Sequence, residues 1–255
     1  MSYYQRHIFF CLNQRDNGAD ACSVHNAQAG FERRVAPGQW PTGRAVDAAG
    51  LGGPVSTCRG TAGAIECVVT QPEGTAKGVA VICHPHPLFG GTMDNKVVQT
   101  LSRALLQLGW TTVRFNFRGV GASGGVWDDG IGEVDDALAV IAQYRTGSQA
   151  LLLAGFSFGA FVAAEAASRL PDGEKAQRLV LVGPSTQKQN IPDVPADTVV
   201  IHGEADEVVP LSCTFDWARP QSLPVIVFPG VGHFFHGQLA LLKRVVVEQL
   251  SVSCV

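Results

Sequence analysis

The sequence predicts an α/β fold in which helices cover both faces of a mostly parallel sheet. From residue 62 to residue 255, short strand-like runs alternate with stretches of helical spacing. The strand-like runs are almost continuously apolar, which is typical of parallel strands buried on both faces. The apolar fraction of 46% is ample for such a core, and turn residues separate the segments.

Seven short strand-like runs are bounded by turn residues. In chain order they are AIECVVTQ (64–71), GVAVIC (78–83), TTVRFNF (111–117), ALLLAG (150–155), RLVLVG (178–183), DTVVIHG (197–203) and LPVIVFPG (223–230). Helices are expected between and after them. In the first helix, 94–108, apolar residues recur at helical spacing and Gly109 supplies the stop. Further helices are expected at 131–144, 158–170 and 238–250.

Residues 1–60 differ in composition from the rest of the chain. After HIFFCLNQRD the chain is rich in Pro, Gly, Arg and Ala and follows neither hydrophobic period. Such a stretch buries too little apolar surface to offset the entropy that is lost on ordering. We therefore expect an irregular or poorly ordered extension over 1–60 and one α/β domain over 61–255.

The charge and the cysteines argue against several classes of protein. A formal net charge of −3 gives no electrostatic basis for binding nucleic acid or an anionic membrane. The apolar runs are too short to span a bilayer, and we find no export signal at the N-terminus. The seven cysteines are irregularly spaced, so free thiols in a reducing cytoplasm are expected.

The sequence GFSFG places Ser157 in a G-x-S-x-G motif. The motif directly follows the run ALLLA and directly precedes the helix expected at 158–170, which is the context of a nucleophilic serine. Such a serine exposes its hydroxyl from a strained backbone, and Gly155 and Gly159 leave room for close packing around it. The alternative is an ordinary glycine-flanked turn, but the strand and the helix together favour a nucleophile.

A serine nucleophile needs a base that takes its proton. With this motif an acid and then a histidine follow the serine along the chain. Of the downstream histidines, His233 is favoured because its loop PGVGHFFHG lies between the last strand and the last helix. His236, which is expected to start that helix, is the weaker candidate. His202 lies at a strand end and is expected to be structural.

The loop HGEADEVVP supplies the acid that orients the base. It offers Glu204, Asp206 and Glu207 directly after a strand. The apolar segment that follows, VVP, should fix the loop and bury one carboxylate. We assign that position to Asp206 and expect the two glutamates to face solvent.

The loop CHPHPLFGG is assigned to the stabilisation of an oxyanion. A tetrahedral intermediate needs preorganised donors, normally the N–H of the residue after the nucleophile, here Phe158, and one N–H from this loop. Pro85 and Pro87 have no N–H and stiffen the loop. The second donor is therefore expected at a non-proline residue, with Leu88 as first choice and His86 as second.

A metal site is the alternative function of this loop, because Cys83, His84 and His86 lie close together in sequence. That alternative lacks a companion cluster, since no HExxH motif and no third nearby histidine occur. A metal assembled with His202 or His233 is the less favoured hypothesis. We expect no metal and no cofactor, and we expect His84 to hold the loop.

A second motif, GVGASG at 119–124, matches the fingerprint of dinucleotide-binding proteins. In that fingerprint the helix starts on the glycines and an acid follows about 20 residues later. Here the loop continues instead, so the dinucleotide hypothesis is rejected. Arg118 and Glu133 are expected either to pair and brace this loop or to be solvated.

Several long motifs occur in a fixed order: CHPHPLFGGTMDNKVV, NFRGVGASGG with GIGEVDDA, GFSFGA, HGEADEVVP and GVGHFFHG. Together they resemble a family of small bacterial α/β-hydrolases often described as cytoplasmic serine esterases. The resemblance implies the α/β-hydrolase fold and a triad of Ser157, Asp206 and His233. It also implies the absence of a large lid, which agrees with the short segment PSTQKQNIPDVPA before the strand DTVVIHG.

The first 30 residues resemble another family. RHIFFCLNQRDNGADACSVHNAQ is similar to the start of thioredoxin-like 2Fe–2S ferredoxins, with Cys11 and Cys22 at the first ligand pair. The C-x3-C pair of that family is absent, so its four-cysteine cluster is not expected. We hypothesise that residues 31–60 arise from a fusion or a reading-frame error between neighbouring genes.

The expected function is a serine hydrolase that forms an acyl-enzyme on Ser157, with a carboxylesterase for small-molecule esters as the leading assignment. Phe89, Phe156, Phe158 and Phe234 are expected to line an apolar acyl pocket. The alternatives are a peptidase or thioesterase of the same fold, an iron–sulfur electron carrier with a passenger domain, and a fold used only for binding.

Overall fold

The structure is a computed structural model that describes residues 55–251, all within the compact unit Arg44–Val255. Most of the extension expected at 1–60 lies outside the described residues. So do Cys11 and Cys22, on which the resemblance to ferredoxins depends.

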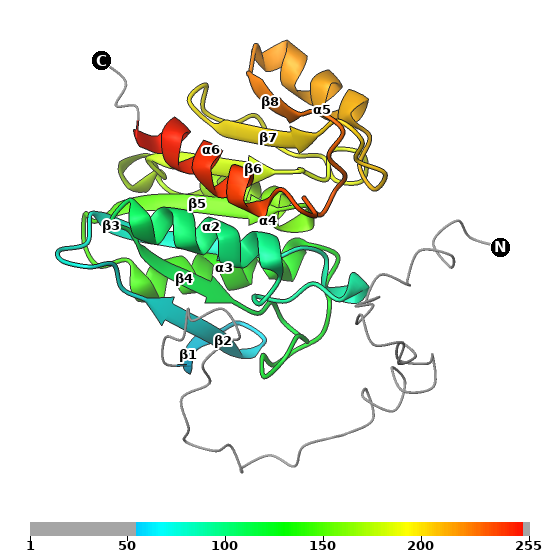
Figure 1. The fold of residues 1–255 in the computed structure, drawn as a ribbon. Coiled ribbons are helices and arrows are strands. Elements are labelled where there is room, and N and C mark those ends of the chain that lie inside the picture. Colours follow the sequence, from blue (N-terminus) through cyan, green and yellow to red (C-terminus); the bar gives the residue numbers. More distant parts are fainter. Residues whose placement is uncertain (1–54, 252–255) are drawn as a thin grey trace, which may run out of the picture. The chain divides into compact units, whose positions relative to one another are not determined.

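An eight-stranded sheet forms the centre of the domain (Figure 1). Its strand order is β1–β2–β4–β3–β5–β6–β7–β8. The pairs β1–β2 and β2–β4 are antiparallel, and all other pairs are parallel. The strands are β1 Val55–Gly60, β2 Gly63–Thr70, β3 Gly78–Cys83, β4 Thr111–Phe115, β5 Ala150–Phe156, β6 Arg178–Val182, β7 Val199–Gly203 and β8 Val225–Phe228.

Helices cover both faces of this sheet. Figure 1 shows α2 and α6 together on the near face, with α3 and α4 on the far face. The helices are α2 Lys96–Gln107, α3 Ile131–Tyr144, α4 Phe158–Arg169, α5 Leu211–Ala218 and α6 Leu239–Ser251, with short 3-10 turns η2 Pro87–Phe89, η3 Asp172–Glu174 and η4 Arg219–Gln221. Within residues 55–251, no helix combines the length and the apolarity that crossing a bilayer requires.

The two faces of the central strands bury different side chains, as the pleat requires. In β3, Val79 and Val81 pack in the core under α3 and α4. Their neighbours Ala80 and Ile82 pack in the core under α2 and α6. Burial on both faces explains why this strand is continuously apolar in sequence. The expected fold class, a mostly parallel sheet between two helical layers and without a large lid, is confirmed.

Two elements differ from the expectations. Strand β1 pairs with β2 from Val55 to Gly60, so the sheet includes residues that we had assigned to the irregular extension. Only Cys58 of this edge strand is buried, which is why no hydrophobic period marks it. Helix α5 was not expected either, because it is short and buries only Thr214 and Ala218.

Candidate active site

Ser157 occupies the sharp turn between β5 and α4. Its backbone dihedrals are φ 57° and ψ −119°, a strained combination for a residue with a side chain. The turn is held by the Ser157 N–H, which donates to the Val182 carbonyl at 2.9 Å, and by the Ser157 carbonyl, which accepts from the Ala160 N–H at 3.0 Å. Only 8% of Ser157 is exposed, so the strain is maintained by rigid surroundings.

The glycines on either side of Ser157 are required by close backbone packing. A Cβ at Gly155 would overlap the backbone of Gly159 and Ala160. A Cβ at Gly159 would overlap the carbonyl groups of Cys83 and His84, at the end of β3. Helix α4 therefore begins in direct contact with the loop that follows β3, and this contact brings that loop to Ser157.

The structure brings Ser157, His233 and Asp206 together in one buried series. Ser157 Oγ lies 3.0 Å from His233 Nε2, and His233 Nδ1 lies 2.6 Å from Asp206 Oδ2. The serine follows β5, the aspartate follows β7 and the histidine follows β8, so the carboxyl ends of three parallel strands supply the series. His236 is exposed and does not take part in it.

Asp206 is held as a carboxylate. Its Oδ1 accepts the N–H groups of Val208 at 2.9 Å and Val209 at 2.8 Å, while Glu204 and Glu207 are exposed. Burial alone would raise the pKa of Asp206. The hydrogen bonds with His233 and Val209 and the nearby imidazoles outweigh burial and hold that pKa below its ordinary value. A charged Asp206 can therefore orient His233 and stabilise its protonated form.

His202, which we expected to be structural, also contacts Asp206. Its Nε2 lies 2.9 Å from the Val209 carbonyl and 3.3 Å from Asp206 Oδ2, and its Nδ1 lies 3.1 Å from Thr214 Oγ1. Burial lowers the pKa of His202, which favours the neutral ring. A neutral ring has one N–H, and the carbonyl of Val209 assigns it to Nε2. Residue type and spacing alone did not indicate the contact between His202 and Asp206.

His84 braces the loop after β3. Its Nε2 accepts the N–H of Phe117 at 3.0 Å, so its Nδ1–H donates to the Pro85 carbonyl at 2.6 Å. Burial lowers the pKa of His84 to about 3, consistent with a neutral ring. Both ring nitrogens are thus occupied by backbone groups. Within residues 55–251, no three His, Cys, Asp or Glu side chains are arranged to hold a metal ion.

His86 and Leu88 were the two candidates for the second oxyanion donor. The N–H of Leu88 donates to His86 Nδ1 at 3.3 Å, and Leu88 is 65% exposed. Among the hydrogen bonds of the described residues, none uses the N–H of His86 or that of Phe158 as donor. The His86 ring lies 5.1 Å from the Phe158 ring, so the two residues are neighbours beside Ser157. The N–H of Leu88 is thus engaged within the loop.

The expected aromatic lining of an acyl pocket is partly wrong. Phe156 and Phe158 are buried in the core and offer no surface to a substrate. Phe89 is 58% exposed and Phe234 is half-buried, so these two can face a bound molecule. Trp127, which the sequence did not single out, stacks on His86 at 4.5 Å.

The loop between β4 and α3 carries Trp127 and is fixed by buried charges. Arg118 pairs with Asp136 on α3, with Nη2 2.9 Å from Oδ1. Glu133 does not pair with Arg118 directly; it accepts the N–H groups of Asp128 at 3.0 Å and Gly130 at 2.8 Å. The expected bracing of this loop therefore exists, with Asp136 in the place that we had given to Glu133.

Comparisons with known proteins identify the fold and the superfamily. A sequence model described as the α/β-hydrolase fold matches residues 81–197. A solved α-β serine hydrolase homologue from Coxiella burnetii is 38% identical, and the match covers 77% of this chain and 97% of that chain with a TM-score of 0.67. The chain belongs to the α/β-hydrolase superfamily.

Two further relatives of this α/β-hydrolase extend the comparison. A serine hydrolase without a lid from Xanthomonas campestris is 36% identical, with coverage of 84% of this chain and 96% of that chain and a TM-score of 0.72. An uncharacterized protein of Rickettsia prowazekii is 42% identical over 115 residues. That match covers 40% of this chain and 48% of the relative, so it spans about half the length of that curated protein.

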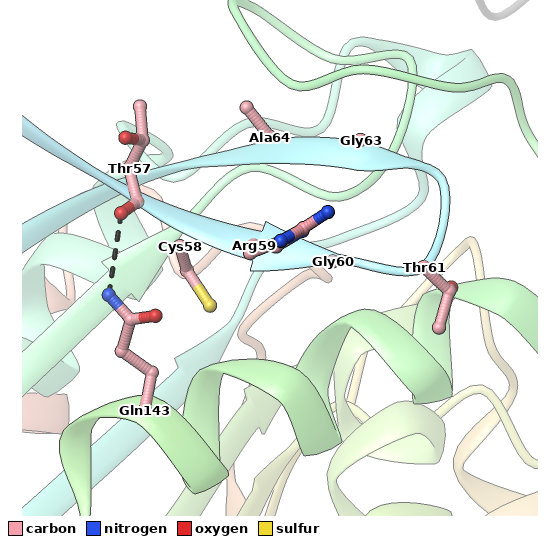
Figure 2. Close-up of a pocket in the computed structure, with 8 residues that line it drawn as sticks. All are labelled: Thr57, Cys58, Arg59, Gly60, Thr61, Gly63, Ala64 and Gln143. Carbon is pink, nitrogen blue, oxygen red and sulfur yellow. Dashed lines mark hydrogen bonds between the residues drawn. The ribbon is translucent and has the colours of Figure 1, made fainter.

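One surface hollow of the α/β-hydrolase lies away from Ser157, at the edge formed by the β1–β2 hairpin and α3 (Figure 2). There the Gln143 side chain reaches the Thr57 carbonyl at 3.4 Å, and the Cys58 thiol points toward α3. None of the candidate site residues is among those that line it, which are Thr57, Cys58, Arg59, Gly60, Thr61, Gly63, Ala64 and Gln143. We assign no chemistry to this hollow.

Proposed function

We propose that this α/β-hydrolase is a serine hydrolase that acts through Ser157, His233 and Asp206, and that its substrates are small carboxylic esters. One observation carries the proposal: the series in which Ser157 Oγ lies 3.0 Å from His233 Nε2 and His233 Nδ1 lies 2.6 Å from Asp206 Oδ2. Hydrogen-bonding distances at both steps are what proton transfer from the serine requires.

In the proposed mechanism, His233 Nε2 takes the Ser157 proton as Oγ bonds to the ester carbonyl carbon. The tetrahedral intermediate collapses when the protonated His233 gives that proton to the leaving alcohol oxygen, which leaves an acyl-enzyme. Water then attacks the acyl group with His233 again as base, and Ser157 is regenerated with release of the carboxylic acid. Asp206 keeps His233 in the required orientation throughout.

The oxyanion is proposed to be held by the backbone N–H groups of Phe158 and His86. Phe158 follows the nucleophile and begins α4, so its N–H belongs to the first turn of a helix, where N–H groups lack helical acceptors. His86 replaces Leu88 as the second donor in this proposal, because the Leu88 N–H already donates to the His86 ring. Two such donors match the number that acyl-transfer sites of this type use.

A short-chain chromogenic ester tests the proposal. We expect the parent protein to hydrolyse it and Ser157→Ala to retain no more than about 10⁻⁴ of the parent kcat. A matched amide and a matched thioester of the same acyl group separate the esterase from a peptidase and a thioesterase. Hydrolysis of the ester at an equal rate by Ser157→Ala would rule out Ser157 as the nucleophile.

A further inference from the structure

The aromatic rings beside Ser157 form a cluster that the proposed reaction does not itself require. His86 follows β3, Trp127 follows β4 and Phe158 follows β5, and these strands are neighbours in the sheet. The rings of His86 and Trp127 stack at 4.5 Å with an interplanar angle of 30°. Each of the two lies 5.1 Å from the ring of Phe158, the residue next to Ser157. Three distant segments thus bring aromatic rings to one place.

Part of this cluster is open to solvent. Phe158 is buried at its base, whereas His86 and Trp127 are half-buried. Phe89, whose ring lies 4.7 Å from that of His86, is exposed. We call the rings of His86, Phe89 and Trp127 the aromatic surface.

Exposed apolar side chains are concentrated in the segments that carry the aromatic surface. Of the seven large apolar side chains that are exposed within residues 55–251, four lie in the loops after β3 and β4 or at the start of α3: Phe89 of the aromatic surface itself, and Leu88, Val126 and Ile131. Concentrations of exposed apolar side chains of this kind mark binding surfaces.

The three rings of the aromatic surface carry no charge of their own at neutral pH, and hydrogen bonds hold two of them. Burial and the nearby charge of Lys188 lower the pKa of His86 to about 4, so its imidazole is neutral. His86 Nδ1 accepts the Leu88 N–H at 3.3 Å. Trp127 Nε1–H donates to Asp129 Oδ1 at 3.0 Å. Lys188 Nζ lies 5.5 Å from the centre of the Phe89 ring, so a cation already faces this ring. The uncharged π faces of the aromatic surface favour a planar apolar group.

We propose that this site selects esters that carry an aromatic ring, which packs on the aromatic surface while the ester carbonyl reaches Ser157. The inference rests on the proposed function and adds the substrate class to it. Aromatic pairs contribute more than the apolar area that they bury. A phenyl group should therefore be preferred to a cyclohexyl group of similar size.

Four esters with matched shapes test this preference. Methyl phenylacetate against methyl cyclohexylacetate places the ring in the acyl part, and benzyl acetate against cyclohexylmethyl acetate places it in the alcohol part. Acid release is followed for the parent protein, Trp127→Leu and Phe89→Leu. The control is Phe215→Leu, which removes a partly exposed phenyl ring on α5, outside the aromatic surface.

In at least one of the two ester pairs, we expect kcat/KM for the phenyl ester to exceed that for the cyclohexyl ester by about twofold to tenfold. The ratio should fall toward unity in Trp127→Leu and Phe89→Leu and stay unchanged in Phe215→Leu. An unchanged urea unfolding midpoint shows that Trp127→Leu and Phe89→Leu are folded.

Two results would overturn the inference while the proposed function stands. One is a phenyl-to-cyclohexyl ratio of kcat/KM near unity for both ester pairs in the parent protein. The other is a ratio that is unchanged in both Trp127→Leu and Phe89→Leu. If the parent protein hydrolyses neither these esters nor the short-chain chromogenic ester, the proposed function fails and the inference falls with it.

Discussion

His202 Nε2 lies 3.3 Å from Asp206 Oδ2, the same carboxylate oxygen that contacts His233 Nδ1 at 2.6 Å. Two imidazoles thus meet at one oxygen. The second nitrogen of each ring has a different partner. That of His233 lies at hydrogen-bonding distance from Ser157, and that of His202 lies at hydrogen-bonding distance from the buried Thr214. The contact gives His202 a means to fix the position of Asp206, and through it the orientation of His233.

Replacement of His202 tests this positioning role. We expect His202→Leu to lower kcat by about tenfold with little change in KM, because Asp206 Oδ2 would lose the imidazole nitrogen that lies 3.3 Å away and the carboxylate would be held less firmly. His202→Gln, whose amide N–H can replace the donor, should recover part of kcat. Steady-state kinetics of ester hydrolysis measure both. A His202→Leu variant with kcat within about twofold of the parent would show that the contact is not used.

The assignment of the second oxyanion donor is tested by a proline. His86 has φ −53°, which a proline ring permits, so His86→Pro removes the N–H with little change of backbone. His86→Ala is the matched control, because it removes the same imidazole and keeps the N–H. We expect His86→Pro to have a kcat about 10²–10³ below that of His86→Ala. Leu88→Ala should retain the parent kcat. Equal kcat values for the two His86 variants would show that the His86 N–H is not the second oxyanion donor.

The close approach of α4 to β3 predicts the effect of one methyl group. Gly159→Ala places a Cβ against the carbonyl groups of Cys83 and His84, which are backbone atoms and yield little. We expect a loss of about 1–3 kcal/mol in the free energy of unfolding and a lower kcat. Gly173→Ala is the control, because no atom lies near its Cβ, and it should be neutral within about 0.5 kcal/mol. Urea unfolding measures both, and equal stabilities would contradict the packing described.

The burial of His84 predicts a pH dependence of stability. The pKa of His84 is about 3 in the folded protein and close to its ordinary 6.5 when unfolded. Between these values the unfolded chain binds a proton that the folded chain does not. The free energy of unfolding should therefore fall as the pH falls, by up to about 1.4 kcal/mol per pH unit below pH 6.5.

Urea unfolding at pH 6 and pH 5 compares the parent with His84→Gln. His202, whose pKa burial also lowers, contributes in the same direction and remains in the variant. We expect the decrease in stability between the two pH values to be smaller for His84→Gln. Equal decreases would mean that His84 is not buried as a neutral ring.

The sequence predicts those elements whose buried faces leave a pattern. The bounds of GVAVIC and of the helix at 131–144 agree with β3 and α3, because all of β3 is apolar and buried and α3 buries Val134, Ala137, Val140 and Ile141 at helical spacing. Strand β1 and helix α5 were missed, since each buries too few side chains to produce a period. The position of β1 depends on its pairing with β2, and that of α5 depends on its packing against β7. A local sequence pattern predicts neither contact.

The candidate site likewise has features that the sequence predicts and features that it does not. The order of Ser157, Asp206 and His233 along the chain, each after a strand, led to residues that the structure brings within hydrogen-bonding distance; their catalytic roles stay a prediction. The choice between His86 and Leu88 depends on a hydrogen bond inside the loop. The burial of Phe156 and Phe158 depends on tertiary packing around them. Neither that hydrogen bond nor this burial can be predicted from the types of residue or their spacing.

The most direct test of the central claim is to locate the adduct of a fluorophosphonate by peptide mass spectrometry. A serine that a neighbouring histidine activates attacks this reagent, whereas ordinary surface serines do not. We expect one phosphonate on the peptide that contains Ser157, and loss of labelling in both Ser157→Ala and His233→Ala. An adduct on another residue, or labelling that persists in Ser157→Ala, would contradict the assignment of Ser157 as the nucleophile.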